Sequence, residues 1–156
     1  MLQQINRVID YSHSNQFLII YIRNEFERVQ WISNLFRNNA AIKGSSGTKL
    51  DDRLHVINDV YFTKKVGSAL TNPLLLEYLT KNKLRRLVIV GLFAEGCVSA
   101  TAKHALKSGF EVTVLSDAVA GASDFKRDKA LVNLKRWGAR IVASQEFLDS
   151  FSHVSR

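Results

Sequence analysis

The chain has one cysteine, and the residues around it indicate a reactive position. Cys97 follows the apolar run 87–92 (LVIVGL), which predicts a buried strand, and precedes residues 98–107, whose pattern predicts a helix. In an open parallel sheet such a strand-to-helix turn lies at the carboxyl edge, where ligands bind. The positive end of the helix dipole favours a thiolate there. Cys97 is therefore a candidate nucleophile, and the alternative is a small residue buried in the core.

The elements that would position this cysteine follow an alternating pattern. Short runs rich in Val, Ile and aromatic residues are apolar nearly throughout, as in parallel strands covered on both faces. The expected strands are residues 17–22, 60–63, 86–92, 110–116 and 139–143, and the expected helices are residues 3–14, 73–81, 98–107 and 124–137. Asn72 before Pro73 marks a helix start, and Gly109 and Gly138 mark helix ends. The pattern predicts one α/β domain over residues 1–156, with a parallel sheet and right-handed crossovers.

Composition narrows the classes of partner. A chain of 156 residues, 46% hydrophobic and 23% charged, suits a globular protein with no membrane partner. The formal charge of +8 comes mainly from residues 81–86 and 124–140, where the basic side chains have the spacing of exposed helix faces. No stacking aromatics alternate with them, so we expect no nucleic-acid partner. One cysteine cannot form an intrachain disulfide and the first residues show no signal-peptide pattern, which fits the cytoplasm.

One long connection, residues 23–59, is the exception to the compact pattern. It carries Phe26, Trp31 and Phe36, which are too many aromatics for a flexible tether. We expect either a lid or pocket wall, with Trp31 as a candidate pocket residue, or a surface that packs against a partner subunit.

Residues 88–121 (VIVGLFAEGCVSATAKHALKSGFEVTVLSDAVAG) resemble the signature of the isochorismatase-like cysteine hydrolases. The residues at the expected spacing are Gly91, Cys97, Val98, Thr101, Ala102, Gly109, Asp117 and Ala118. The similarity continues through most of the chain, including INRVID, GTKLDDRL and YFTKKVGSAL. It implies a three-layer α/β fold, with a mostly parallel sheet between helices on both faces.

The same resemblance implies a site. Cys97 matches the family's nucleophile, and Lys64 matches its lysine, although without the motif Lys64 would be taken for an ordinary surface residue. A cis peptide bond is implied between Leu92 and Phe93, and the backbone amides of Phe93 and Cys97 would form an oxyanion hole. Relatives usually have alanine where this chain has Phe93, so the identity of the substrate is left open.

The third member of the family's triad is an aspartate on an N-terminal strand, and this sequence starts after that strand. In the family the strand lies in the middle of the sheet, between the strands expected here at residues 17–22 and 86–92. The coding start could lie upstream, the chain could be truncated, or another carboxylate could serve. Candidates for the last case are Asp10, Glu25 and Glu95, of which Glu25 and Glu95 are also candidate pocket residues. We favour an upstream start or a truncation, because a general base must lie within hydrogen-bond reach of its proton.

These features predict a cysteine-dependent hydrolase of a small amide-type (C–N) substrate that works through a thioester. The alternative is a catalytically inactive, truncated family member that acts as a binding or oligomeric protein. We expect no cofactor and no metal, because none of the chain's histidines stands in a metal-binding motif; these are His13, His55, His104 and His153. The expected partners are a small-molecule substrate and further copies of the chain, as a dimer or tetramer.

Overall fold

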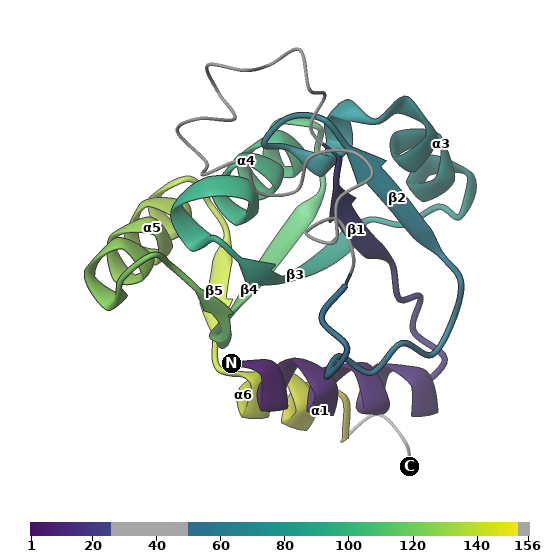
Figure 1. Cartoon of the computed structure of the whole chain (residues 1–156), viewed down its shortest axis with the longest axis horizontal. Coiled ribbons are helices and arrows are strands. Elements are labelled where there is room, and N and C mark those ends of the chain that lie inside the picture. The colour runs from purple at the N-terminus through teal and green to yellow at the C-terminus, as the bar shows by residue number, and fades with distance from the viewer. Residues whose placement is uncertain (26–49, 153–156) are drawn as a thin grey trace.

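The computed structural model describes residues 1–25 and 50–152, which form an α/β fold (Figure 1). The elements in chain order are α1 (Leu2–Ser14), β1 (Tyr21–Asn24), β2 (Tyr61–Lys64), the 3-10 turn η2 (Ala69–Thr71), α3 (Pro73–Lys81), β3 (Arg86–Leu92), the π-helical turn η3 (Ala94–Val98), α4 (Ser99–Lys107), β4 (Glu111–Ala120), α5 (Asp124–Arg136), β5 (Arg140–Val142) and α6 (Ser144–Ser152). Within these residues, no helix combines the length and apolar character that a membrane crossing requires.

All the strand pairs are parallel, but the strands form two sheets. β1 pairs with β2 so that Tyr21 lies opposite Tyr61 and Asn24 lies opposite Lys64. β4 is the central strand of the second sheet, in the order β3-β4-β5. In the described part of the chain, no strand joins β1 to β3, which is the position that the resemblance gives to the family's N-terminal strand. That strand stays a prediction.

Two apolar clusters cover opposite faces of the sheets, which gives the three expected layers (Figure 1). On one face, α3, α4 and α5 contribute Leu75, Leu79, Ala102, Ala105, Ala130 and Leu134. On the other face, α1 and α6 contribute Ile5, Val8, Ile9, Phe147 and Leu148. β4 is covered from both sides, as its apolar sequence predicted, and its buried residues include Val114, Leu115 and Ala118. β3 is less covered than its apolar run predicted: none of its residues is buried, and Val88 and Leu92 are 41% and 51% exposed.

Local sequence signals explain several boundaries. Asn72 caps α3 by accepting a hydrogen bond from Leu74 N at 3.0 Å, and Pro73 occupies the first helical position. Gly138 ends α5 with φ at +101°, a conformation that favours glycine. β3 has its expected bounds, but β4 runs four residues beyond its expected end.

Two other boundaries differ from the sequence-based expectation. β1 starts at Tyr21 rather than at residue 17, because its partner strand β2 starts only at Tyr61. α6 was not expected, and its first residue is held by a distant one. Asp117 accepts hydrogen bonds from Ser144 N at 2.8 Å and from Ser144 Oγ at 2.6 Å.

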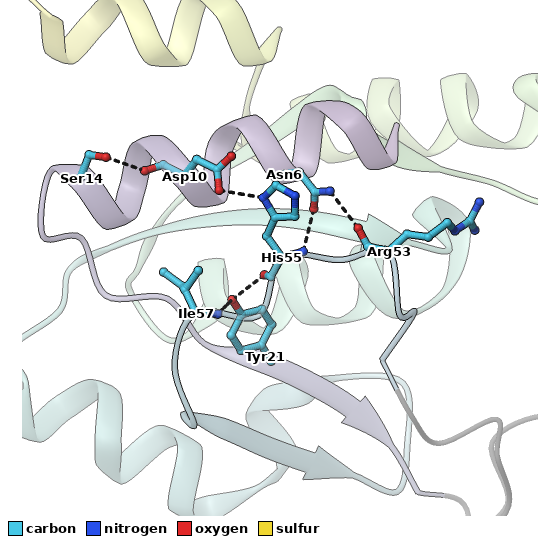
Figure 2. Close-up of polar contacts among 7 residues, drawn as sticks. All are labelled: Asn6, Asp10, Ser14, Tyr21, Arg53, His55 and Ile57. Carbon is cyan, nitrogen blue, oxygen red and sulfur yellow. Dashed lines mark hydrogen bonds and ion pairs between the residues drawn. The ribbon is translucent and has the colours of Figure 1, made fainter.

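Side chains of α1 and β1 hold the segment that leads into β2 (Figure 2). Asn6 donates to Arg53 O at 2.9 Å and accepts from His55 N at 3.0 Å, so one side-chain amide satisfies two backbone groups. The Tyr21 hydroxyl donates to His55 O at 2.9 Å and accepts from Ile57 N at 3.2 Å. The start of β2, and through it Lys64, is thereby fixed relative to α1 and β1.

Candidate active site

The candidate site forms where three parallel strands end. Asn24 and Lys64 are the last residues of β1 and β2, and they lie opposite each other in the register. Cys97 lies in η3, the turn that follows β3. The carboxyl ends of these strands therefore bring together residues that lie far apart in the sequence, as the general rule for parallel sheets predicts.

The side chains of Lys64 and Cys97 are in contact. Lys64 Nζ lies 3.0 Å from Cys97 Sγ and donates a second hydrogen bond to Val66 O at 3.0 Å. The lysine is only 5% exposed, whereas Cys97 is partly buried. The contact places the amine of Lys64 directly against the sulfur.

The turn that carries the cysteine has an unusual backbone. The peptide bond between Leu92 and Phe93 is cis, where the resemblance implies one. Phe93 O then accepts hydrogen bonds from Gly96 N at 2.9 Å and from Val98 N at 3.2 Å, which closes the turn below Cys97. The side chains of Leu92 and Phe93 are about half exposed, at 51% and 49%. An oxyanion hole made by the amides of Phe93 and Cys97 remains a prediction.

The segment after Lys64 packs tightly on α4. Gly67 approaches so closely that an added Cβ would lie 3.2 Å from Ala100 Cβ. Ala69 N donates to Thr101 Oγ1 at 3.0 Å. Ser68 Oγ lies 3.0 Å from His104 Nδ1, so His104 contacts this segment from a helix face. These contacts hold the backbone on which Lys64 and its acceptor Val66 depend.

Of the three carboxylates considered as replacement acids, Asp10 and Glu95 have side-chain contacts with other residues. Asp10 lies on α1, and its Oδ1 is 2.8 Å from His55 Nδ1 (Figure 2). Glu95 accepts a hydrogen bond from Ala122 N at 2.9 Å, although it lies in the same turn as Cys97. Glu25 follows Asn24 directly, and its backbone N donates to Lys64 O at 2.9 Å. Trp31, the remaining candidate pocket residue, and residues 26–49 of the long connection lie outside the described residues.

The motif residue Asp117 has a structural position rather than a place beside Cys97. Its partial burial would raise the pKa, but the hydrogen bonds from the Ser144 hydroxyl and backbone amide outweigh this effect and lower the pKa below 3.8. Asp117 thus acts as a charged cap for α6, since it bonds the first residue of that helix.

The histidines do not assemble into a metal centre in the parts of the chain that the structure covers. Residues 1–25 and 50–152 contain no group of three or more His, Cys, Asp or Glu side chains placed to hold a metal ion. His153 lies outside these residues.

Sequence reasoning missed one residue of the site. Asn24 Oδ1 lies 4.0 Å from Cys97 Sγ, within the range of a weak S–H···O hydrogen bond. Its sequence signal is slight: a polar residue that comes two positions after an expected strand. Only the parallel pairing of Asn24 with Lys64 shows that both side chains reach the sulfur.

Comparison with known proteins identifies similar chains. A family model described as "Isochorismatase domain" matches residues 1–146. A secreted isochorismatase effector of Phytophthora sojae is 28% identical over 102 residues, which cover 64% of this chain and 49% of that protein. The chain spans between 42% and 59% of the length of the curated relatives that it matches.

Solved structures show the same fold. An isochorismatase-like hydrolase from Alkaliphilus metalliredigens superimposes with a TM-score of 0.87 at 18% identity, covering 96% of this chain and 84% of that one. The pyrazinamidase of Pyrococcus horikoshii, solved in complex with zinc, gives a TM-score of 0.80 at 28% identity, covering 91% and 84%.

Proposed function

This chain belongs to the isochorismatase family, and we propose that it hydrolyses a small amide-type substrate with Cys97 as the nucleophile. The observation that carries the proposal is the 3.0 Å contact between Lys64 Nζ and Cys97 Sγ at the carboxyl edge of the strands. A buried ammonium beside a partly buried cysteine is an arrangement that activates a thiol. Two similar structures, an N-carbamoylsarcosine amidase and the pyrazinamidase, are named for the cleavage of C–N bonds.

The proposed reaction has two stages. The Cys97 thiolate attacks the carbonyl carbon, an S–C bond forms, and the carbonyl π electrons move to oxygen. The amides of Phe93 and Cys97 would stabilise this oxyanion. As the carbonyl re-forms, the C–N bond breaks and the leaving nitrogen takes a proton, which leaves a thioester on Cys97.

Water then attacks the thioester and releases the carboxylic acid and the thiolate. We assign the acid that protonates the nitrogen, and later the base that takes the proton of water, to a carboxyl group. The resemblance implies this group on a strand between β1 and β3. The role of Lys64 is to hold the negative charge of the sulfur, because its Nζ is the buried cation in contact with Sγ.

The experiment is a screen of small primary amides, carbamoyl compounds and aryl esters for hydrolysis. The acyl-enzyme is trapped by rapid acid quench and detected by mass spectrometry of the intact protein. The sequence has a single cysteine, so a thioester adduct can form only at Cys97. Cys97→Ala should lower turnover by at least about 10³-fold, as loss of a nucleophile does elsewhere. The control is Lys65→Met, since Lys65 is exposed and next to the proposed site.

Full turnover in Cys97→Ala would refute the nucleophile assignment. A folded chain that hydrolyses none of these substrates would instead favour the inactive alternative, a binding or oligomeric member of the family. For either function we propose that the chain forms a homo-oligomer, which sedimentation velocity at micromolar concentration tests. We place it in the cytoplasm because its one cysteine is free, although one relative is a secreted effector.

A further inference from the structure

The turn that carries Cys97 lies beside the loop that precedes α5. β3 and β4 are parallel, and their last paired residues are Leu92 and Ala120. Because the two strands end opposite each other, the chain leaves both of them at the same edge of the sheet. The turn η3 follows β3, and residues 121–123 follow β4. A contact between these two segments can therefore fix the position of the turn.

Glu95 makes this contact. Its Oε1 accepts a hydrogen bond from Ala122 N at 2.9 Å. Its Oε2 lies so close to Gly121 that a Cβ added to the glycine would be 2.9 Å from this oxygen. The added carbon would also lie 2.8 Å from Arg127 N, so Gly121 leaves room for the carboxylate at the start of α5. The side chain of Glu95 thus packs against the backbone of a second element.

The two ends of the turn are held by contacts of their own. Phe93 O accepts hydrogen bonds from Gly96 N at 2.9 Å and from Val98 N at 3.2 Å. Ala94 and Val98 are buried in the core, at 0% and 4% exposed. Between them, Glu95 and Gly96 are exposed. The hydrogen bond of Glu95 therefore ties the exposed middle of the turn to the loop before α5.

The middle of the turn matters for the proposed reaction because the proposed oxyanion donors flank it. These donors are the backbone amides of Phe93 and Cys97, two positions before and two positions after Glu95. A shift of the turn would move one donor relative to the other while the buried ends stay in place. Such donors act only when they point at the oxygen on which charge develops, and a misplacement of about 1 Å can slow a reaction about 100-fold.

We propose that Glu95 is a positioning residue, which holds Ala122 N and so fixes the turn with the amides of Phe93 and Cys97 directed at one oxygen. The inference rests on the proposed function, since it takes Cys97 to attack a carbonyl group and these amides to bind the oxyanion. It gives Glu95 no proton to transfer, so this carboxylate acts through its hydrogen bond and not as a replacement acid.

The test compares two reagents that react with the same sulfur. p-Nitrophenyl acetate acylates a thiol through an oxyanion, and its nitrophenolate leaves without taking a proton, so this reaction does not depend on the catalytic acid. Iodoacetamide alkylates a thiol by displacing iodide, and no oxyanion forms. Both adducts are measured by mass spectrometry of the intact protein, and the acylation that persists in Cys97→Ala is subtracted. The quantity compared is the acylation rate divided by the alkylation rate, in which a general change in thiol reactivity cancels.

Glu95→Ala should lower this ratio about 10- to 100-fold, while its alkylation rate stays within about threefold of the wild type. Glu95→Gln keeps an oxygen that can accept from Ala122 N, and its ratio should stay within about threefold of the wild type. The matched control is Glu111→Ala, which removes the same side chain from an exposed residue at the other end of β4 and should leave both rates unchanged.

An unchanged ratio in Glu95→Ala would overturn the proposal. Equal losses in Glu95→Ala and Glu95→Gln would also overturn it, because they would assign the effect to the acid rather than to the hydrogen bond. If Glu95→Ala does not fold, as judged by its thermal melt, Glu95→Asp decides, since its shorter side chain withdraws the carboxylate from Ala122 N; a wild-type ratio in this variant would overturn the proposal. Failure of the proposed function has a different signature, equal acylation of the wild type and Cys97→Ala, and the inference would fall with it.

Discussion

The most direct prediction concerns the charge of Lys64. Lys64→Met removes the ammonium and keeps an unbranched side chain of similar length in a buried position. At the 3.0 Å that separates Nζ from Sγ, Coulomb's law gives about 5.5 kcal/mol for a pair of unit charges at an effective dielectric constant of about 20. Cys97 is half-buried, so solvent screens part of this interaction.

A retained stabilisation of about 1.4 to 4 kcal/mol corresponds to a factor of about 10 to 1000 in the reactivity of the sulfur, because 1.36 kcal/mol is a factor of ten. Alkylation of Lys64→Met by iodoacetamide at pH 7 should therefore be about 10- to 1000-fold slower than that of the wild type. The rate is followed by intact-protein mass spectrometry, with iodoacetate as a second reagent of different charge.

Lys65→Met is the matched control, because it changes the net charge equally at an exposed neighbouring residue. Its alkylation rate should stay within about twofold of that of the wild type, since exposed charges are screened. Equal alkylation rates for Lys64→Met and the wild type would refute the activating role of the Lys64–Cys97 contact. The unfolding free energy should change little in Lys64→Met, because the loss of the contact is offset by the loss of a buried charge.

Two further predictions concern the rest of the fold. Because its pKa is lowered in the folded state, Asp117 should stabilise the chain above pH 3.8, and this contribution should be lost as the pH falls below that value. The free energy of unfolding, measured with denaturant, should therefore be higher for the wild type than for Asp117→Asn at pH 6, and this difference should shrink toward pH 2.5. A difference that stays the same at both pH values would contradict this account. An apolar strand ending in aspartate, fused before Met1, should raise both the melting temperature and the turnover, because it would pair with the edges of β1 and β3 that have no partner among the described strands. A fused strand that changes neither quantity would argue against the predicted central strand.

The sequence predicted those elements whose signals are local. The bounds of β3 follow from a run of apolar residues, and the start of α3 follows from Asn72 and Pro73. The start of β1 did not follow in this way, because pairing with Tyr61 decides which residues of the apolar run form a strand. α6 was missed because its first residue is fixed by Asp117, which lies 27 residues earlier in the chain.

The residues of the candidate site also divide into those with a local sequence signal and those placed by distant contacts. Cys97 could be singled out from its strand-to-helix turn alone, whereas Lys64 came from the resemblance, because 33 residues separate it from the cysteine. Asn24 lies 73 residues from Cys97, and no motif marks it. Asn24 lies near Cys97 because β1 and β2 end opposite each other in the register, with Asn24 paired to Lys64. The pattern of residue types does not reveal this register.

The division of the strands into two sheets has a consequence for local unfolding. β4 is paired on both sides and includes the fully buried Val114, Leu115 and Ala118, so its amide hydrogens should exchange only when the whole domain opens. β1 and β2 pair only with each other among the described strands, and they can separate from the rest without breaking hydrogen bonds of the second sheet. Because Asn24 and Lys64 belong to this smaller unit, its opening would take them away from Cys97 while the remaining core stays folded. Thiol reactivity should therefore become ordinary at a temperature below the global melting transition.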